Sequence, residues 1–312
     1  MNTQNTPSLD FIAEPTCGEK PKTYGFKPGL AERFLNLLIG AFITIFRIDG
    51  KGYISNLFIQ RLNPQAEIQF EYSDQTTTTL IFRTGHGRHL WRVKTFFTEE
   101  PMMIDWLRTL KPNDIFLDIG ANVGMYTIPA ASICQQVYAC ELDPVNIGIL
   151  KENIHLNKAH GKVVILPFAA SDKMELVDIY YRDFSKGDAL QSVGRESPFR
   201  TIVGTGAHHQ QQVSFPLDFI FRNLSLGAPT KVKIDVDGNE RIVFAGAKST
   251  ILQAQEIYYE DSGLAESAEI VETILAAGFE IHRMEQTANQ KAAKNILFKR
   301  KERSIQPSSV TS

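Results

Sequence analysis

Short apolar runs and longer helical segments alternate along the chain from residue 114 onward. The strand-like runs are 114–118, 136–141, 162–167, 231–236 and 255–260, and the helical segments are 125–133, 144–157, 239–253 and 266–277. Strands that alternate with helices pair in parallel and are covered on both faces. Two further strand-like runs, 278–283 and 294–300, enclose a polar segment. We therefore predict an α/β fold with a seven-stranded, mostly parallel sheet, ended by a strand pair that supplies one antiparallel member.

The part of the chain before residue 114 follows a different pattern. Short alternating runs that indicate strands lie at 67–72, 77–83 and 89–93. Residues 98–110 carry a helix signal, with Thr98 as the expected cap and Pro101 in the first turn. The predicted organisation is a flexible leader at 1–28, an N-terminal helix and small β-rich subdomain at 29–97, a main domain at 98–300 and a disordered tail at 301–312. The unpatterned stretch 180–212 is predicted to be a binding segment, a lid or a disordered loop.

Composition narrows the classes of partner and compartment. The 312 residues carry a formal net charge of −2, which gives no electrostatic footprint for nucleic acid, so none is expected as a partner. The three cysteines have no metal-ligand spacing, so no metal is expected and a reducing, cytoplasmic location is favoured. The apolar run 34–46 is shorter than the roughly 20 residues that a membrane span needs. A docked helix is favoured there, and peripheral membrane contact through 29–47 is the alternative.

The segment that follows the first strand-like run of the sheet is typical of a nucleotide-binding turn. Asp118 ends the run, Gly120 and Gly124 bracket a tight turn through Ala121 and Asn122, and a helical segment follows. A dinucleotide site would place a pyrophosphate over this turn, and the Asp118 carboxylate would repel it. A cofactor with an ammonium and a sulfonium group would be attracted instead, which favours S-adenosylmethionine.

Acidic and short polar residues end the next two strand-like runs. Glu141 lies 23 residues after Asp118, where a carboxylate accepts hydrogen bonds from both ribose hydroxyls of an adenosine. The neighbouring Leu142 belongs to the same expected cofactor site. Ser171 and Asp172 are candidates for the adenine amino group, with an ordinary turn as the alternative. A nicotinamide-dependent oxidoreductase is disfavoured, because Asn122 stands where its fingerprint requires a glycine.

Five segments together resemble the FkbM-type methyltransferase family. They are DIGANVGMY at 118–126, ELDP at 141–144, FAASD at 168–172, PLD at 216–218 and VKIDVDGNE at 232–240. The resemblance covers roughly residues 98–300 and implies a class I methyltransferase (Rossmann-like) fold that uses S-adenosylmethionine. It also implies O-methylation of a hydroxyl on a sugar, glycan or natural-product-like acceptor. Asp237 departs from the family pattern, which usually has Glu at this position.

The segment Asp235–Glu240 is the expected catalytic segment. It lies at the carboxyl end of a buried strand, where ligands bind in doubly wound sheets. Strand alternation predicts Asp235 and Asp237 on one side, and Glu240 in the first turn of the next helix. Asp235 or Asp237 is expected to orient or deprotonate the acceptor, with Glu240 nearby; the alternative is a helix-start cluster of acids. A non-catalytic adenosylmethionine-binding protein is the remaining alternative, and the acceptor is not identified by the sequence.

Overall fold

The computed structural model describes residues 64–85, 87–181, 192–193, 208–264, 266–286 and 293–301, together with Phe34, Leu37 and Leu38 of a helix. The predicted leader at 1–28, the rest of 29–47 and the tail from residue 302 lie outside the described residues. The described residues from Pro64 onward belong to one compact unit. Among the described residues, no helix combines the length and the apolar character that crossing a membrane requires.

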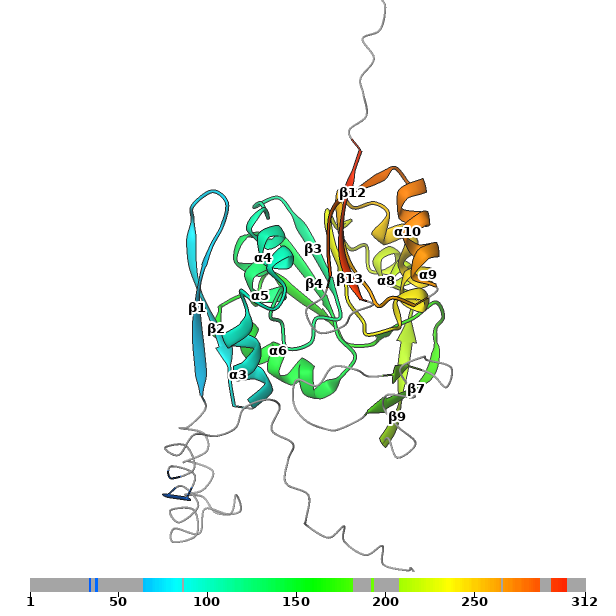
Figure 1. The fold of residues 1–312 in the computed structure, drawn as a ribbon. Coiled ribbons are helices and arrows are strands. Elements are labelled where there is room, and N and C mark those ends of the chain that lie inside the picture. Colours follow the sequence, from blue (N-terminus) through cyan, green and yellow to red (C-terminus); the bar gives the residue numbers. More distant parts are fainter. Residues whose placement is uncertain are drawn as a thin grey trace, which may run out of the picture. The chain divides into compact units, whose positions relative to one another are not determined.

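A seven-stranded sheet forms the centre of this unit (Figure 1). Its strands are β3 (Ile115–Ile119), β4 (Gln136–Cys140), β5 (Val163–Leu166), β10 (Lys231–Ile234), β11 (Glu256–Asp261), β12 (Phe279–Gln286) and β13 (Lys294–Arg300). The spatial order is β12-β13-β11-β10-β3-β4-β5. Five neighbouring strands run parallel, and β13 pairs antiparallel with both β11 and β12. The predicted sheet, with a single antiparallel member, is confirmed, and this strand order is that of class I methyltransferases.

Side chains alternate across the strands and divide the interior into two cores. Phe116 and Tyr258 belong to the core on one face, and Leu117 and Tyr259 to the core on the other. The first core is covered by α4 (Pro101–Arg108), α5 (Thr127–Ile133) and α6 (Pro144–Leu156), and the second by α8 (Leu217–Asn223), α9 (Glu240–Ile251) and α10 (Ser267–Ala276). The hairpin of β1 (Gln65–Glu71) and β2 (Thr77–Arg83) adds Phe70 and Phe82 to the first core.

Two local predictions about the residues before α4 are wrong. The run 89–93 lies in helix α3 (Gly87–Thr95) and not in a strand. His89 is buried, and Val93 and Phe96 follow at helical spacing, while Leu90 and Trp91 are exposed. Five residues are too few to separate alternation from one helical turn. Thr98 also does not cap α4: its hydroxyl donates to the Thr95 carbonyl.

The end of the predicted loop 180–212 has regular structure. Strand β9 (His208–Phe215) pairs antiparallel with β7 (Glu175–Tyr181), and β6 (Ala169–Ala170) and β8 (Ser192–Val193) complete a small second sheet. The local sequence of β9 is rich in His and Gln and has no apolar period until Val213. Its strand conformation therefore depends on pairing with β7, which is a tertiary effect.

Candidate active site

The turn after β3 holds together the carboxyl ends of three strands. Gly120, Asn122 and Gly124 have φ values of +82°, +49° and +88°, which is a conformation that glycine adopts without strain. A Cβ on Gly120 would lie 1.8 Å from the carbonyl oxygen of Asp235. The Gly120 N–H donates to the carbonyl of Cys140 over 3.0 Å. The predicted glycine turn is thus required by the close approach of β10 and is fixed to the end of β4.

Glu141 links this turn to the helix that follows β4. Its Oε2 accepts the N–H of Asn122 over 2.7 Å, and its Oε1 accepts the N–H of Asp143 over 2.8 Å. Burial raises the pKa of Glu141 to about 7, although these hydrogen bonds lower it. The Asn146 side chain also hydrogen-bonds this carboxylate. Because a carboxylate has about four lone-pair sites, the group keeps an acceptor for a ribose hydroxyl of an adenosine. The residues at this strand end therefore fit the adenosine part of S-adenosylmethionine.

Asp118 lies beneath the turn and is not open to a ligand. Its side chain is 1% exposed and accepts the hydroxyl of Thr127 over 2.6 Å. Lys233, on the neighbouring strand β10, is also 1% exposed; its Nζ lies 3.3 Å from Asp118 Oδ1 and 3.0 Å from Asp235 Oδ2. The same ammonium donates to the Gly120 carbonyl over 3.2 Å. The sequence suggested that the Asp118 carboxylate attracts a cationic cofactor directly. In the structure, this carboxylate is already paired with the ammonium of Lys233.

A cluster of carboxyl groups stands at the ends of β10 and β11, and sequence reasoning found only part of it. Asp235 was expected there, but Glu260 at the end of β11 and Glu100 before α4 were not. Glu260 donates a hydrogen bond to Asp235, and the negative charge of Asp235 together with burial holds the pKa of Glu260 well above its ordinary value. Burial raises the pKa of Asp235, but the charge of Lys233 and hydrogen bonds outweigh it and leave the pKa lowered. The pair thus has one carboxyl group with a raised pKa, Glu260, and one with a lowered pKa, Asp235.

Glu100, the residue that precedes α4, is the third carboxyl group of this cluster. Burial and the charge of Asp235 raise the pKa of Glu100 to about 7, although Lys233 and a hydrogen bond with Tyr126 lower it. A signal for Glu260 was available, because it ends a strand beside the one that carries Asp235. No such signal existed for Glu100, because it reads as an ordinary acid at a helix start. The described residues contain no group of His, Cys, Asp and Glu side chains suited to holding a metal ion.

The other two expected catalytic residues lie beyond the strand. Because β10 ends at Ile234 and Asp237 has a φ of +49°, strand alternation does not extend to Asp237. Glu240 begins α9 and is 3% exposed. Its Oε1 accepts the Gly238 N–H over 2.8 Å, and its Oε2 accepts the Ser262 hydroxyl over 2.7 Å. Burial raises the pKa of Glu240 to about 7. Both catalytic assignments stay predictions, and the contacts of Glu240 suit a positioning residue.

The remaining expected cofactor residues lie around the same sheet edge. Ala121 is buried in the first core, and Leu142 packs against the small cluster of Ala169 and Ile179. Ser171 is 3% exposed, whereas Asp172 beside it is exposed, and their side chains are 3.3 Å apart. The adenine contact assigned to Ser171 or Asp172 stays a prediction.

The segment of the chain that matches known proteins contains the turn after β3. The family model described as TRM5/TYW2 methyltransferase domain matches residues 97–179. A tRNA (guanine(37)-N(1))-methyltransferase of Dictyostelium discoideum is 37% identical over 124 residues, which is 39% of this chain and 23% of that protein. A ribosomal protein L11 methyltransferase of Anoxybacillus flavithermus is 35% identical over 69 residues, 22% of each. The chain thus spans less than a quarter of the length of these relatives.

Among solved structures, methyltransferase FkbM from Methylobacillus flagellatus KT matches with a TM-score of 0.45 at 15% identity, over 61% of this chain and 44% of that one. Trm5b from Pyrococcus abyssi matches with a TM-score of 0.40 at 13% identity, over 75% and 63%. These likenesses are too weak to assign a family, so the resemblance to FkbM-type enzymes stays a prediction.

The strand order and the turn are those of the class I methyltransferase fold, whose cofactor is S-adenosylmethionine, and the segment that matches the methyltransferase family model contains the turn. The sequence relatives include tRNA and ribosomal protein methyltransferases.

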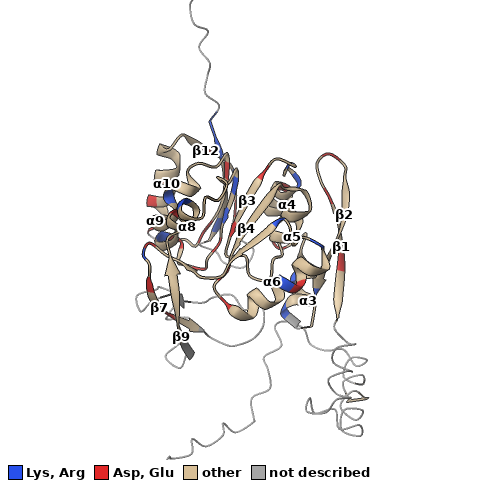
Figure 2. Ribbon diagram, turned by 180° about the vertical axis from the view of Figure 1, so that it is seen from behind, with Lys and Arg blue, Asp and Glu red and all other residues tan. Residues whose placement is uncertain are grey.

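The expected exclusion of nucleic acid, with a small-molecule or glycan acceptor in its place, is wrong, because the relatives named above include tRNA methyltransferases. The net charge is a sum over the whole chain, so it does not show whether a local surface can bind nucleic acid. In the described part of the chain, residues of both signs are interspersed among the elements (Figure 2).

Proposed function

We propose that this chain transfers the methyl group of S-adenosylmethionine to a ring nitrogen of a guanine in RNA. Two kinds of observation support the proposal. The sequence relatives include several tRNA (guanine(37)-N(1))-methyltransferases. The carboxyl cluster of Glu100, Asp235 and Glu260 offers the acceptors that the N1–H and N2–H donors of guanine require.

The observation that carries the proposal is the gathering of carboxyl groups at the ends of β10 and β11, beside the buried ammonium of Lys233, whose Nζ lies 3.0 Å from Asp235 Oδ2. Methylation of N1 requires that its proton leave, and a base works best when its pKa lies near the operating pH. Glu100, with a pKa of about 7, is suited to take that proton. Asp235 stays ionised beside Lys233 and is suited to accept the neighbouring N–H and orient the ring. The bound cofactor supplies an electrophilic methyl group on sulfonium.

Positioning provides much of the expected rate. The acceptor nitrogen must lie about 3 Å from the methyl carbon, in line with the bond that breaks. The Gly120 turn and the Asp235 backbone are in contact, so the two halves of the site share one rigid edge. Glu141 holds the adenosine side and Asp235 the acceptor side of this edge in the proposed arrangement.

The test is methyl transfer from radiolabelled S-adenosylmethionine to unmodified tRNA transcripts, followed by nucleoside analysis. We expect 1-methylguanosine, and no label in transcripts whose target guanine is replaced by adenine. Glu100→Gln keeps the size of the side chain and removes the base, so turnover is expected to fall about 10²- to 10⁴-fold with unchanged cofactor affinity. Label that enters a ribosomal protein fraction and no RNA would overturn the proposal.

A further inference from the structure

The hydroxyl of Tyr258 is a buried polar group without a hydrogen-bond partner in the described structure. Tyr258 is 1% exposed and lies in the middle of β11. Its ring stacks on Trp106 with centroids 5.5 Å apart and an interplanar angle of 24°, which fixes the direction of the hydroxyl. A buried hydroxyl that makes no hydrogen bond destabilises the folded state, so its retention needs an explanation.

The backbone register directs this hydroxyl toward the carboxyl cluster. Tyr258 pairs with Lys233 across β10 and β11, and neighbouring residues in register share one face of a sheet. Glu260, two residues further along β11, lies on that face as well. Burial and the charges of Glu100, Glu260 and Asp235 together hold the pKa of Tyr258 far above its ordinary value, which agrees with the face that the register gives it.

We infer that Asp235, Glu260 and Tyr258 form the subsite that reads the hydrogen-bonding edge of the acceptor, with the Tyr258 hydroxyl as a specificity group that gains its partner when the acceptor binds. The inference rests on the proposed function for the identity of the acceptor. Asp235 and Glu260 are partly exposed and are therefore contacted first. Because the Glu260 proton is donated to Asp235, the three groups offer carboxyl oxygens as acceptors and one hydroxyl that can donate or accept.

This set of groups suits guanine better than adenine. Guanine presents N1–H and N2–H as donors beside the O6 acceptor, so an ionised carboxylate and a donor side by side match its edge. Adenine presents an unprotonated N1 toward Glu100 and has no N2–H to donate to the Asp235 carboxylate. A site built to hydrogen-bond a donor discriminates strongly against a ligand that lacks it, because its buried polar groups then stay unpaired.

The test uses Tyr258→Phe, which removes one oxygen atom and leaves the Trp106 contact. We expect unchanged or slightly higher thermal stability, because the free protein loses an unsatisfied group, and an unchanged affinity for S-adenosylmethionine. The KM for tRNA is expected to rise about tenfold, which is the loss of one hydrogen bond of about 1.4 kcal/mol. Tyr259→Phe is the matched control: it removes the same atom from the next residue, which belongs to the opposite core, and is expected to keep the KM of the wild type.

A second measurement separates this inference from the proposed function. Equilibrium binding of guanosine 5′-monophosphate and adenosine 5′-monophosphate is measured in the presence of S-adenosylhomocysteine, without methyl transfer. Preference of the wild type for the guanine nucleotide, reduced about tenfold in Tyr258→Phe, supports the subsite even when no RNA is methylated, a case that overturns only the proposed function. Equal binding of both nucleotides, or a Tyr258→Phe variant identical to the wild type while RNA is methylated, overturns the subsite.

Discussion

Lys233 is the position where a single substitution tests the reasoning about the site most directly. Its ammonium is the cation that lies between Asp118 and Asp235, at 3.3 Å and 3.0 Å. Lys233→Met keeps the length of the aliphatic chain and removes that charge, which leaves the fully buried Asp118 carboxylate uncompensated. Removing one partner of a buried ion pair costs about 3–5 kcal/mol. Since domains have a total stability of roughly 5–15 kcal/mol, this variant is expected to be close to unfolding.

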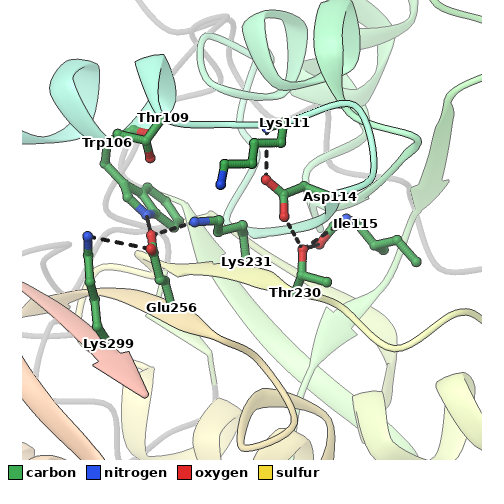
Figure 3. A network of polar contacts seen from close by, with 9 residues as sticks. All are labelled: Trp106, Thr109, Lys111, Asp114, Ile115, Thr230, Lys231, Glu256 and Lys299. Atoms are coloured by element: carbon green, nitrogen blue, oxygen red, sulfur yellow. Dashed lines mark hydrogen bonds and ion pairs between the residues drawn. The ribbon is translucent and has the colours of Figure 1, made fainter. Parts of the chain in front are cut away.

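Lys231→Met is the matched control, two residues earlier on the same strand. Lys231 pairs with Glu256 over 2.6 Å, with side-chain exposures of 9% and 14%. Figure 3 shows that Glu256 also accepts from Trp106 Nε1 and faces Lys299, at 2.6 Å and 3.6 Å. Glu256 therefore keeps two partners when Lys231 is replaced. We expect a loss of about 1 kcal/mol, well below that of Lys233→Met.

Urea unfolding followed by circular dichroism gives both losses. The lowered pKa of Asp235 means that the stabilisation by Lys233 is complete above the ordinary pKa of an aspartate and is lost as the pH falls through the folded value. The difference between wild type and Lys233→Met is therefore expected to be constant near neutral pH and to shrink in acid. Adding Asp118→Asn should restore part of the loss. Equal losses for Lys233→Met and Lys231→Met would refute the reasoning.

Three further variants test the cofactor and acceptor sides of the site. Gly120→Ala is expected to lose more than about 2 kcal/mol of unfolding free energy and to lose cofactor binding, because its Cβ would lie 1.8 Å from the Asp235 carbonyl oxygen. Gly148→Ala is the control: the space around this residue is open, so the variant is expected to be neutral or stabilised by up to about 1 kcal/mol. Equal stability of the two variants in thermal unfolding would contradict this. Glu141→Gln should weaken S-adenosylmethionine binding about 10- to 100-fold in calorimetry. Because burial raises the pKa of Glu141 to about 7, wild-type affinity should increase as the pH rises through 7, and persistence of that increase in the variant would exclude Glu141 as its source. Asp237→Asn should cut turnover far more than cofactor affinity, and unchanged turnover would remove Asp237 from the mechanism.

The predictions that succeeded share a physical origin. The strands β3 and β4 are short, mainly apolar runs buried on both faces, so their hydrophobicity reveals them. In β10, Val232 and Ile234 alternate with two lysines that are also buried. Glycines with positive φ mark the turn, because other residues are strained there. The strand prediction for residues 89–93 was wrong because the helical spacing of the buried residues becomes visible only when Phe96, which packs in the core, is included. The strand β9 was not predicted because its conformation depends on β7, which lies about thirty residues earlier in the chain.

The sequence by itself determined the fold class, the cofactor turn and the acidic residues at three strand ends. These features are local, since each depends on a strand and the residues that directly follow it. Only the tertiary structure decided which charges are free to act. It pairs Asp118 with Lys233, raises the pKa of Glu260 beside Asp235 and brings Glu100 to the same edge. The physical reason is that protonation depends on burial and on neighbouring charge, and both are set by residues far apart in the chain.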